Sequence, residues 1–105
     1  MEKPNLNYIK QLSGSDLLFR NQLINLIKKE FSSEKKEYYD NLKNNDLIKT
    51  AGNVHKLKHK ITIFGLAKGY ELAQQYENEL REGSSITSAK FNIILNVISN
   101  FIEEI

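Results

Sequence analysis

Apolar residues recur every three or four positions along most of the chain, the spacing that places them on one side of an α-helix. This spacing predicts a short helix over 5–12 and longer helices over 17–43, 47–64, 67–81 and from about 87 to the end. No segment alternates with period two for long enough to form a strand. The pattern therefore predicts an all-α fold, an antiparallel four-helix bundle with a short additional N-terminal helix.

Polar and glycine-containing segments separate the predicted helices. Ser15 or Asp16 can cap the second helix and Asp46 the third, while Gly65 suits a left-handed helix terminus. The expected inward-facing positions are Leu6, Ile9, Leu12, Phe19, Leu23, Leu26, Ile27, Phe31, Tyr38, Leu42, Leu47, Val54, Leu57, Ile61, Phe64, Gly69, Ala73, Tyr76, Leu80, Phe91, Ile94, Ile98, Phe101 and Ile105.

Composition narrows the function classes. With 105 residues, the chain is expected to form one domain, 1–105, too small for a deep catalytic cleft or an ATP-binding domain. It has no cysteine, which excludes disulfides and thiolate metal sites, and no apolar run near the ~20 residues that span a bilayer. The net charge of +2 does not call for nucleic acid, and the lysines at 56, 58 and 60 are interpreted as a solvated face. We expect a cytoplasmic monomer that binds neither nucleic acid nor membrane.

His55 falls outside the apolar rhythm of its helix. At about 100° per residue it lies roughly 140° from the centre of the predicted seam, so it should face solvent. Lys58 lies one turn further on, at the margin of the seam, and its replacement is expected to cost little stability. The expected neighbours of His55 on the outer strip, where a partner could dock, are Ile48, Ala51, Gly52, His59 and Thr62.

The segment around His55 resembles the histidine-containing phosphotransfer (HPt) domain family. His55, Leu57 and Lys58 match the first half of the family's motif, and Phe64 with Gly65 match the second half. The resemblance implies that His55 accepts a phosphoryl group, that Lys58 assists electrostatically, and that Gly65 permits a tight turn. It also implies a two-component phosphorelay, in which a receiver domain of a response regulator and a hybrid sensor kinase are the partners. The chain would be a phosphocarrier without a cofactor of its own, and Mg²⁺ would lie in the receiver.

His59 departs from the family pattern, because a small residue is expected four positions after the phosphoacceptor. A histidine there could obstruct the receiver, select a particular partner or hydrogen-bond the phosphoryl group. His55 and His59 also have the i, i+4 spacing with which two imidazoles share a zinc ion, but with no cysteine or third histidine we expect no metal site. The alternative to phosphotransfer is a degenerate HPt-like interaction module that binds a receiver or kinase without being phosphorylated.

Overall fold

All regular structure in the chain is helical. The computed structural model describes residues 2–105, and within that range there are five helices and no strand. They are α1 (Asn7–Ser13), α2 (Leu17–Lys43), α3 (Leu47–Ile63), α4 (Ala67–Arg81) and α5 (Ser88–Glu103). The prediction of an all-α fold is confirmed, and the boundaries of the four longer helices lie within one residue or two of those predicted.

Local side-chain chemistry sets the helix ends. The Asp16 carboxylate accepts a hydrogen bond from the Phe19 backbone N–H at 2.9 Å and so caps α2. Asp46 caps α3 in the same way. The first helix begins at Asn7, two residues later than predicted, and the Asn5 backbone N–H that precedes it donates to the Phe64 carbonyl at 2.9 Å. The N-terminal segment is therefore attached to the turn between α3 and α4.

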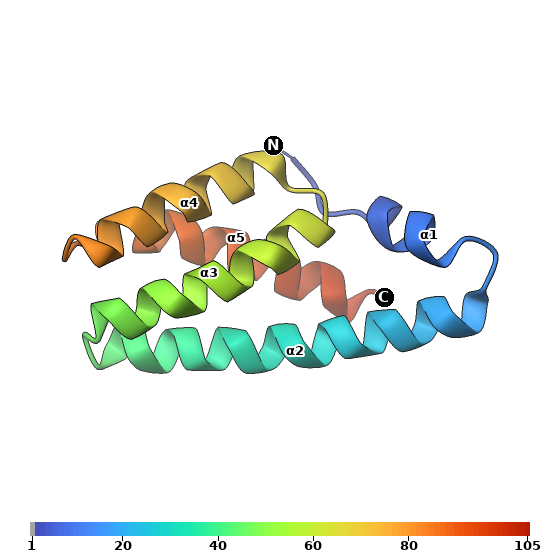
Figure 1. Cartoon of the computed structure of the whole chain (residues 1–105), viewed down its shortest axis with the longest axis horizontal. Helices are drawn as coiled ribbons and strands as arrows, with labels where there is room; N and C mark the ends of the chain where they lie inside the picture. The colour runs from blue at the N-terminus through green and yellow to red at the C-terminus, as the bar shows by residue number, and fades with distance from the viewer. Residues whose placement is uncertain (1) are drawn as a thin grey trace.

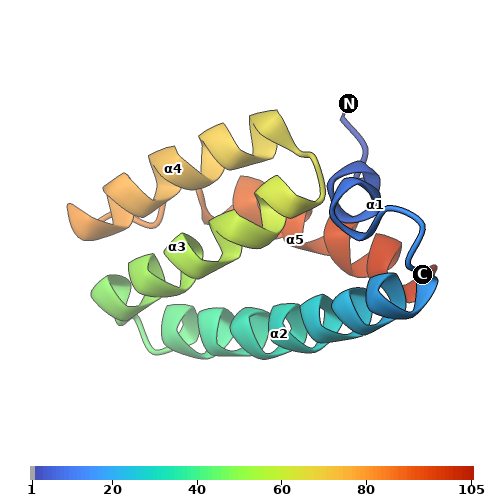
Figure 2. The same cartoon turned by 45° about the vertical axis from the view of Figure 1, so that its right-hand side comes forward.

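The helices pack side by side as a bundle. Figures 1 and 2 show α3 between α2 and α4, with α5 passing behind them and α1 beside the start of α2. Short turns join α2 to α3 and α3 to α4. Because α3 has a helix on each side, it buries a wide arc of its surface and leaves only its outer face to solvent.

The predicted core is largely confirmed, with most differences near the chain ends. Leu12, Phe19 and Leu26 are exposed. The first turns of α2 extend beyond the ends of α3 and α4, and α1 packs beside them (Figure 1). In α5, Leu95 and Ile102 are buried, whereas Ile94 and Phe101 are only partly covered. Apolar residues lie on several sides of α5, so spacing alone did not determine which of them face inward.

A buried polar contact joins α2, α4 and α5. The Tyr38 hydroxyl lies 2.9 Å from the Tyr76 hydroxyl and donates to Asn92 Oδ1 at 2.8 Å, so Tyr76 donates to Tyr38. Burial raises the pKa of both phenols above their ordinary value of 10.0. Both tyrosines were predicted to be core residues, and both are fully buried.

Across residues 2–105, no helix combines the length and the apolar character needed to cross a membrane.

Gly65 ends α3 with a φ of +79°, which confirms the predicted left-handed terminus. An alanine Cβ there would lie 2.6 Å from Asn5 Nδ2, in addition to the left-handed backbone cost of roughly 1–2 kcal/mol. We expect Gly65→Ala to lower the free energy of unfolding by about 2 kcal/mol in urea titrations followed by circular dichroism. Gly52→Ala is the matched control, because that site lies inside α3 with open space around it, and it should stabilise by about 0.5–1 kcal/mol. Equal effects of the two substitutions would contradict this account of the turn.

Candidate functional site

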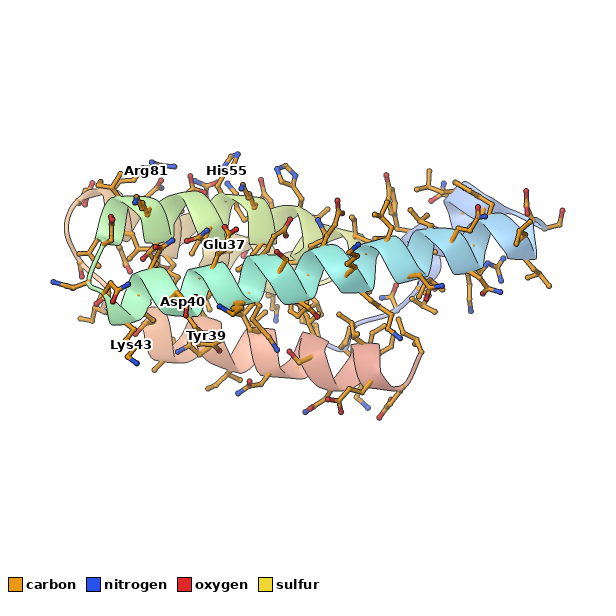
Figure 3. All side chains as sticks on the ribbon, turned by 90° about the horizontal axis from the view of Figure 1, so that it is seen from below. Glu37, Tyr39, Asp40, Lys43, His55 and Arg81 are labelled. Atoms are coloured by element: carbon orange, nitrogen blue, oxygen red, sulfur yellow. The ribbon has the colours of Figure 1, made fainter. Side chains whose placement is uncertain are left out.

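The inward seam of α3 places His55 on the outside of the bundle. Val54, Leu57 and Ile61 are fully buried, and the His55 side chain is 54% exposed. Figure 3 shows His55 projecting from α3 at the edge of the molecule, away from α2. The prediction that His55 faces solvent is confirmed.

Lys58 is more deeply buried than its predicted position at the margin of the seam indicates. The residue is 6% exposed, and its ammonium lies 3.0 Å from Glu77 Oε1 on α4. It also donates to Gln74 Oε1 at 2.7 Å and lies 5.6 Å from the centre of the Tyr70 ring. Lys58 therefore connects α3 to α4 and is fully paired within the bundle.

Glu77 is the residue that connects this site, and the sequence interpretation missed it. The residue is 6% exposed. Its Oε1 lies 3.0 Å from Lys58 Nζ and 3.3 Å from His55 Nδ1, and its Oε2 accepts from Arg81 at 3.0 Å. Glu77 was not among the residues predicted for the site. A signal was present, because position 77 lies four residues after Ala73 on the inward side of α4.

Electrostatics keep Glu77 ionised. Burial alone would raise the pKa of its carboxyl, but hydrogen bonds from Lys58 and Arg81, with a smaller one from His55, outweigh burial and lower the pKa below its ordinary value of 4.5. An ionised carboxylate can only accept, so the His55 Nδ1 must carry the proton in this contact. In the neutral ring the lone pair is then on Nε2, on the opposite side from Glu77.

The depressed pKa of Glu77 predicts an acid-sensitive contribution to stability. A carboxyl with a lowered folded-state pKa stabilises the fold above its unfolded-state pKa, near 4.5, and that contribution is lost as the pH falls through the folded-state value. We expect stability to fall as the pH is lowered below 4.5, and Glu77→Gln to flatten this dependence, measured as unfolding midpoints across the acid range. Glu71→Gln removes an exposed carboxylate from the same helix and is the control. If the stability of Glu77→Gln fell as steeply with decreasing pH as that of the native chain, Glu77 would not be the source of the acid sensitivity.

A shallow groove lies beside His55, between the C-terminal half of α3 and the N-terminal half of α4. It has a volume of about 930 Å³ and is lined by α3, α4 and the turn between them, with Tyr8 of α1 contributing at one end. The groove contains five residues of the predicted site, namely His55, Lys58, His59, Thr62 and Gly65. Tyr8 and Tyr70 were not predicted to belong to it.

The predicted outer strip is only partly brought to this groove. His59 and Thr62 are exposed and line the groove, and the His59 ring lies with its centre 5.5 Å from that of His55 in an edge-on arrangement. Ile48 is exposed but lies in a separate hollow near the C-terminal end of α4, and Gly52 is half-buried. Ala51 was predicted to face solvent, which is wrong because it is fully buried.

The burial of Ala51 has the same cause as the burial of Lys58. At 100° per residue, the two positions lie within about 20° of each other on α3, toward the edge where Lys58 meets α4. The predicted seam includes only the large apolar side chains of α3. The buried arc of the helix is wider than that seam, because the small Ala51 and the paired Lys58 also contribute to it.

Among residues 2–105, no group of three or more histidine, cysteine, aspartate or glutamate side chains is placed to hold a metal ion. Comparisons with models of known protein families, with curated proteins and with solved structures gave no match.

Proposed function

We propose that this chain is a histidine phosphotransfer module of a two-component phosphorelay. His55 accepts a phosphoryl group from the aspartate of a receiver domain and passes it to another receiver. The proposal includes the finer architecture of that family, an antiparallel four-helix bundle with a short additional helix. It also includes the partners implied by the resemblance, a response-regulator receiver domain and a hybrid sensor kinase, and action in the cytoplasm as a monomer.

The observation that supports this function best is the contact between His55 Nδ1 and the buried carboxylate of Glu77 at 3.3 Å. It fixes the ring so that the nucleophilic Nε2 faces away from the bundle. In the transfer step the Nε2 lone pair attacks phosphorus, a P–N bond forms, and the P–O bond to the receiver aspartate breaks. The ring becomes cationic when Nε2 is phosphorylated, and Glu77 stabilises that charge through the Nδ1 proton.

The groove beside His55 suits the approach of a receiver domain. Its walls contain Thr62, Leu66 and Tyr70, and it is open to solvent along the side where His55 and His59 are exposed. A partner that settles there would bring its aspartyl phosphate to the Nε2 side of the ring. The Mg²⁺ expected in the receiver would neutralise charge on the transferring group.

Lys58 acts mainly through Glu77 in this proposal. Its ammonium is paired with Glu77 and Gln74 in the resting bundle, so it is not free to reach a phosphoryl group without leaving those partners. Its first role is to hold the Glu77 carboxylate ionised and in position beside His55. Electrostatic assistance by Lys58, as the resemblance implies, would begin when the incoming phosphoryl charge competes with Glu77 for the ammonium.

The second candidate function is a non-transferring module that binds a receiver or kinase. The position of His59 favours it, because a second imidazole lies beside His55 on the face that a receiver must approach. The experiment that separates the two is incubation with receiver domains of the same genome that carry an aspartyl phosphate. Phosphotransfer predicts an acid-labile, base-stable label on the chain, detected by phosphorus NMR and intact mass. Stable binding without any label from these receivers would favour the non-transferring module.

A further inference from the structure

His55 and His59 form a pair of imidazoles whose separation suits a chelate. The two residues lie one turn apart on α3, both are exposed, and their ring centres are 5.5 Å apart with the planes at 88°. A metal–nitrogen bond of about 2.0–2.1 Å puts each ring centre about 3.2 Å from the ion, so two rings that share a tetrahedral ion have centres about 5.2 Å apart. The observed separation is therefore already close to that of a shared ion, without a change in the backbone.

Glu77 provides the second observation that points to a metal. A metal-binding histidine usually donates its other ring N–H to a carboxylate, which fixes the tautomer and makes the ligating nitrogen more basic. The buried Glu77 carboxylate stands in that relation to His55, at 3.3 Å from Nδ1. The nitrogen left for an ion is Nε2, the same atom that would attack a phosphoryl group.

The kind of ion follows from the donors. Two imidazoles suit Zn²⁺, Ni²⁺ and Cu²⁺, whereas Mg²⁺ prefers oxygen ligands and near-octahedral geometry. With only two protein donors, water would occupy the other coordination positions. The exposed side of the groove beside the two rings provides room for them.

We propose that His55 and His59 together bind a divalent transition-metal ion such as Zn²⁺ through their outward ring nitrogens. Because the ion occupies Nε2 of His55, it blocks phosphorylation of that residue, and this second part rests on the proposed phosphotransfer function. His59, which occupies the position of a small residue in the HPt pattern, would then make the site sensitive to free metal.

Metal binding can be tested without any phosphorylation assay. The full chain is titrated with ZnCl₂ at neutral pH, and binding is measured by calorimetry and by NMR of the imidazole protons. The chain has only two histidines, so every imidazole signal belongs to the pair. We expect one equivalent of Zn²⁺ to shift both rings together, reversal by EDTA, and no shift with MgCl₂.

The matched control keeps two histidines but separates them. His59→Gln removes one donor. The double variant Lys56→His with His59→Gln again has two histidines, but at positions 55 and 56, which are both exposed and do not share a face of the helix. Because the second donor binds intramolecularly in the native pair, both variants should bind Zn²⁺ about 100-fold more weakly. Equal affinity in the double variant and the native chain would overturn the chelate, as would shifts confined to one ring.

Inhibition is tested separately. The transfer assay is run first on metal-free protein, and then on chain to which Zn²⁺ has been added, while the receiver is kept free of Zn²⁺. If the metal-free chain is labelled, saturation with Zn²⁺ should suppress labelling of the native chain. At the same free Zn²⁺, labelling of His59→Gln should stay close to the level that this variant itself shows without metal. Persistence of labelling at saturation would overturn the competition. Absence of labelling in metal-free protein would contradict the proposed function and leave the calorimetric result on the chelate as it stands.

Discussion

Replacement of His55 by glutamine is expected to abolish the acid-labile, base-stable phosphoryl label that a charged receiver domain transfers to the chain. Glutamine retains a hydrogen-bonding group that can face Glu77, but it has no ring nitrogen that can act as a nucleophile. The loss should be complete in phosphorus NMR and intact mass. Because the His55 side chain is largely exposed, the variant should retain its fold, with an unfolding free energy within about 1 kcal/mol of the native value.

His59→Gly is the control for this experiment, because His59 is the only other histidine and lies one turn away on the same face. Labelling should persist in that variant. A faster rate would mean that the His59 ring obstructs the receiver, and a slower rate that it contacts the phosphoryl group. Undiminished label in His55→Gln would show that His55 is not the acceptor, and loss of that label only in His59→Gly would assign the reaction to His59.

Lys58→Met is expected to lower the free energy of unfolding by about 3 kcal/mol. Removal of one partner from a buried ion pair leaves the other charge uncompensated, at a cost of about 3–5 kcal/mol. The lower figure applies here because Arg81 still donates to Glu77. The sequence interpretation had placed Lys58 at the margin of the seam and predicted little loss of stability. The ion pair with Glu77 reverses that expectation.

Urea denaturation of three variants tests this assignment. Lys56→Met alters an exposed lysine on the same helix and should change stability by no more than about 0.5 kcal/mol. The double variant Lys58→Met with Glu77→Leu replaces both buried charges by apolar groups and should recover most of the loss caused by Lys58→Met alone. If Lys58→Met and Lys56→Met were equally mild, the pair would have no structural role. A double variant less stable than Lys58→Met would contradict the uncompensated-charge explanation.

Local signals were sufficient for the secondary structure. Asp16 and Asp46 marked two helix starts, and Gly65 marked the end of α3, because caps and left-handed termini depend on chemistry within a few residues. The outward position of His55 was also predictable, since the large apolar residues of α3 define where the interior lies. The face of α5 that is buried was not predictable, because the apolar residues of this helix do not lie on a single face.

The residues that surround His55 could not be read from α3 alone. Glu77 lies 22 positions further along the chain, and the helical period of α3 contains no information about which side chain of α4 will reach the imidazole. The same limit explains Ala51, whose burial depends on the second helix that packs against α3. Tyr8 reaches the groove from α1. The periodicity predicted that this segment is helical, but not where the helix lies in the bundle.

The sequence by itself determined that the chain is helical, where its four longer helices begin and end to within two residues, and that His55 points outward, because those properties follow from neighbours within a few positions. Only the tertiary structure decided that Lys58 is buried and paired and that Glu77 holds His55 by Nδ1. Those contacts depend on the separation and rotation of α3 and α4, which are fixed by the packing of the whole bundle and not by either helix alone.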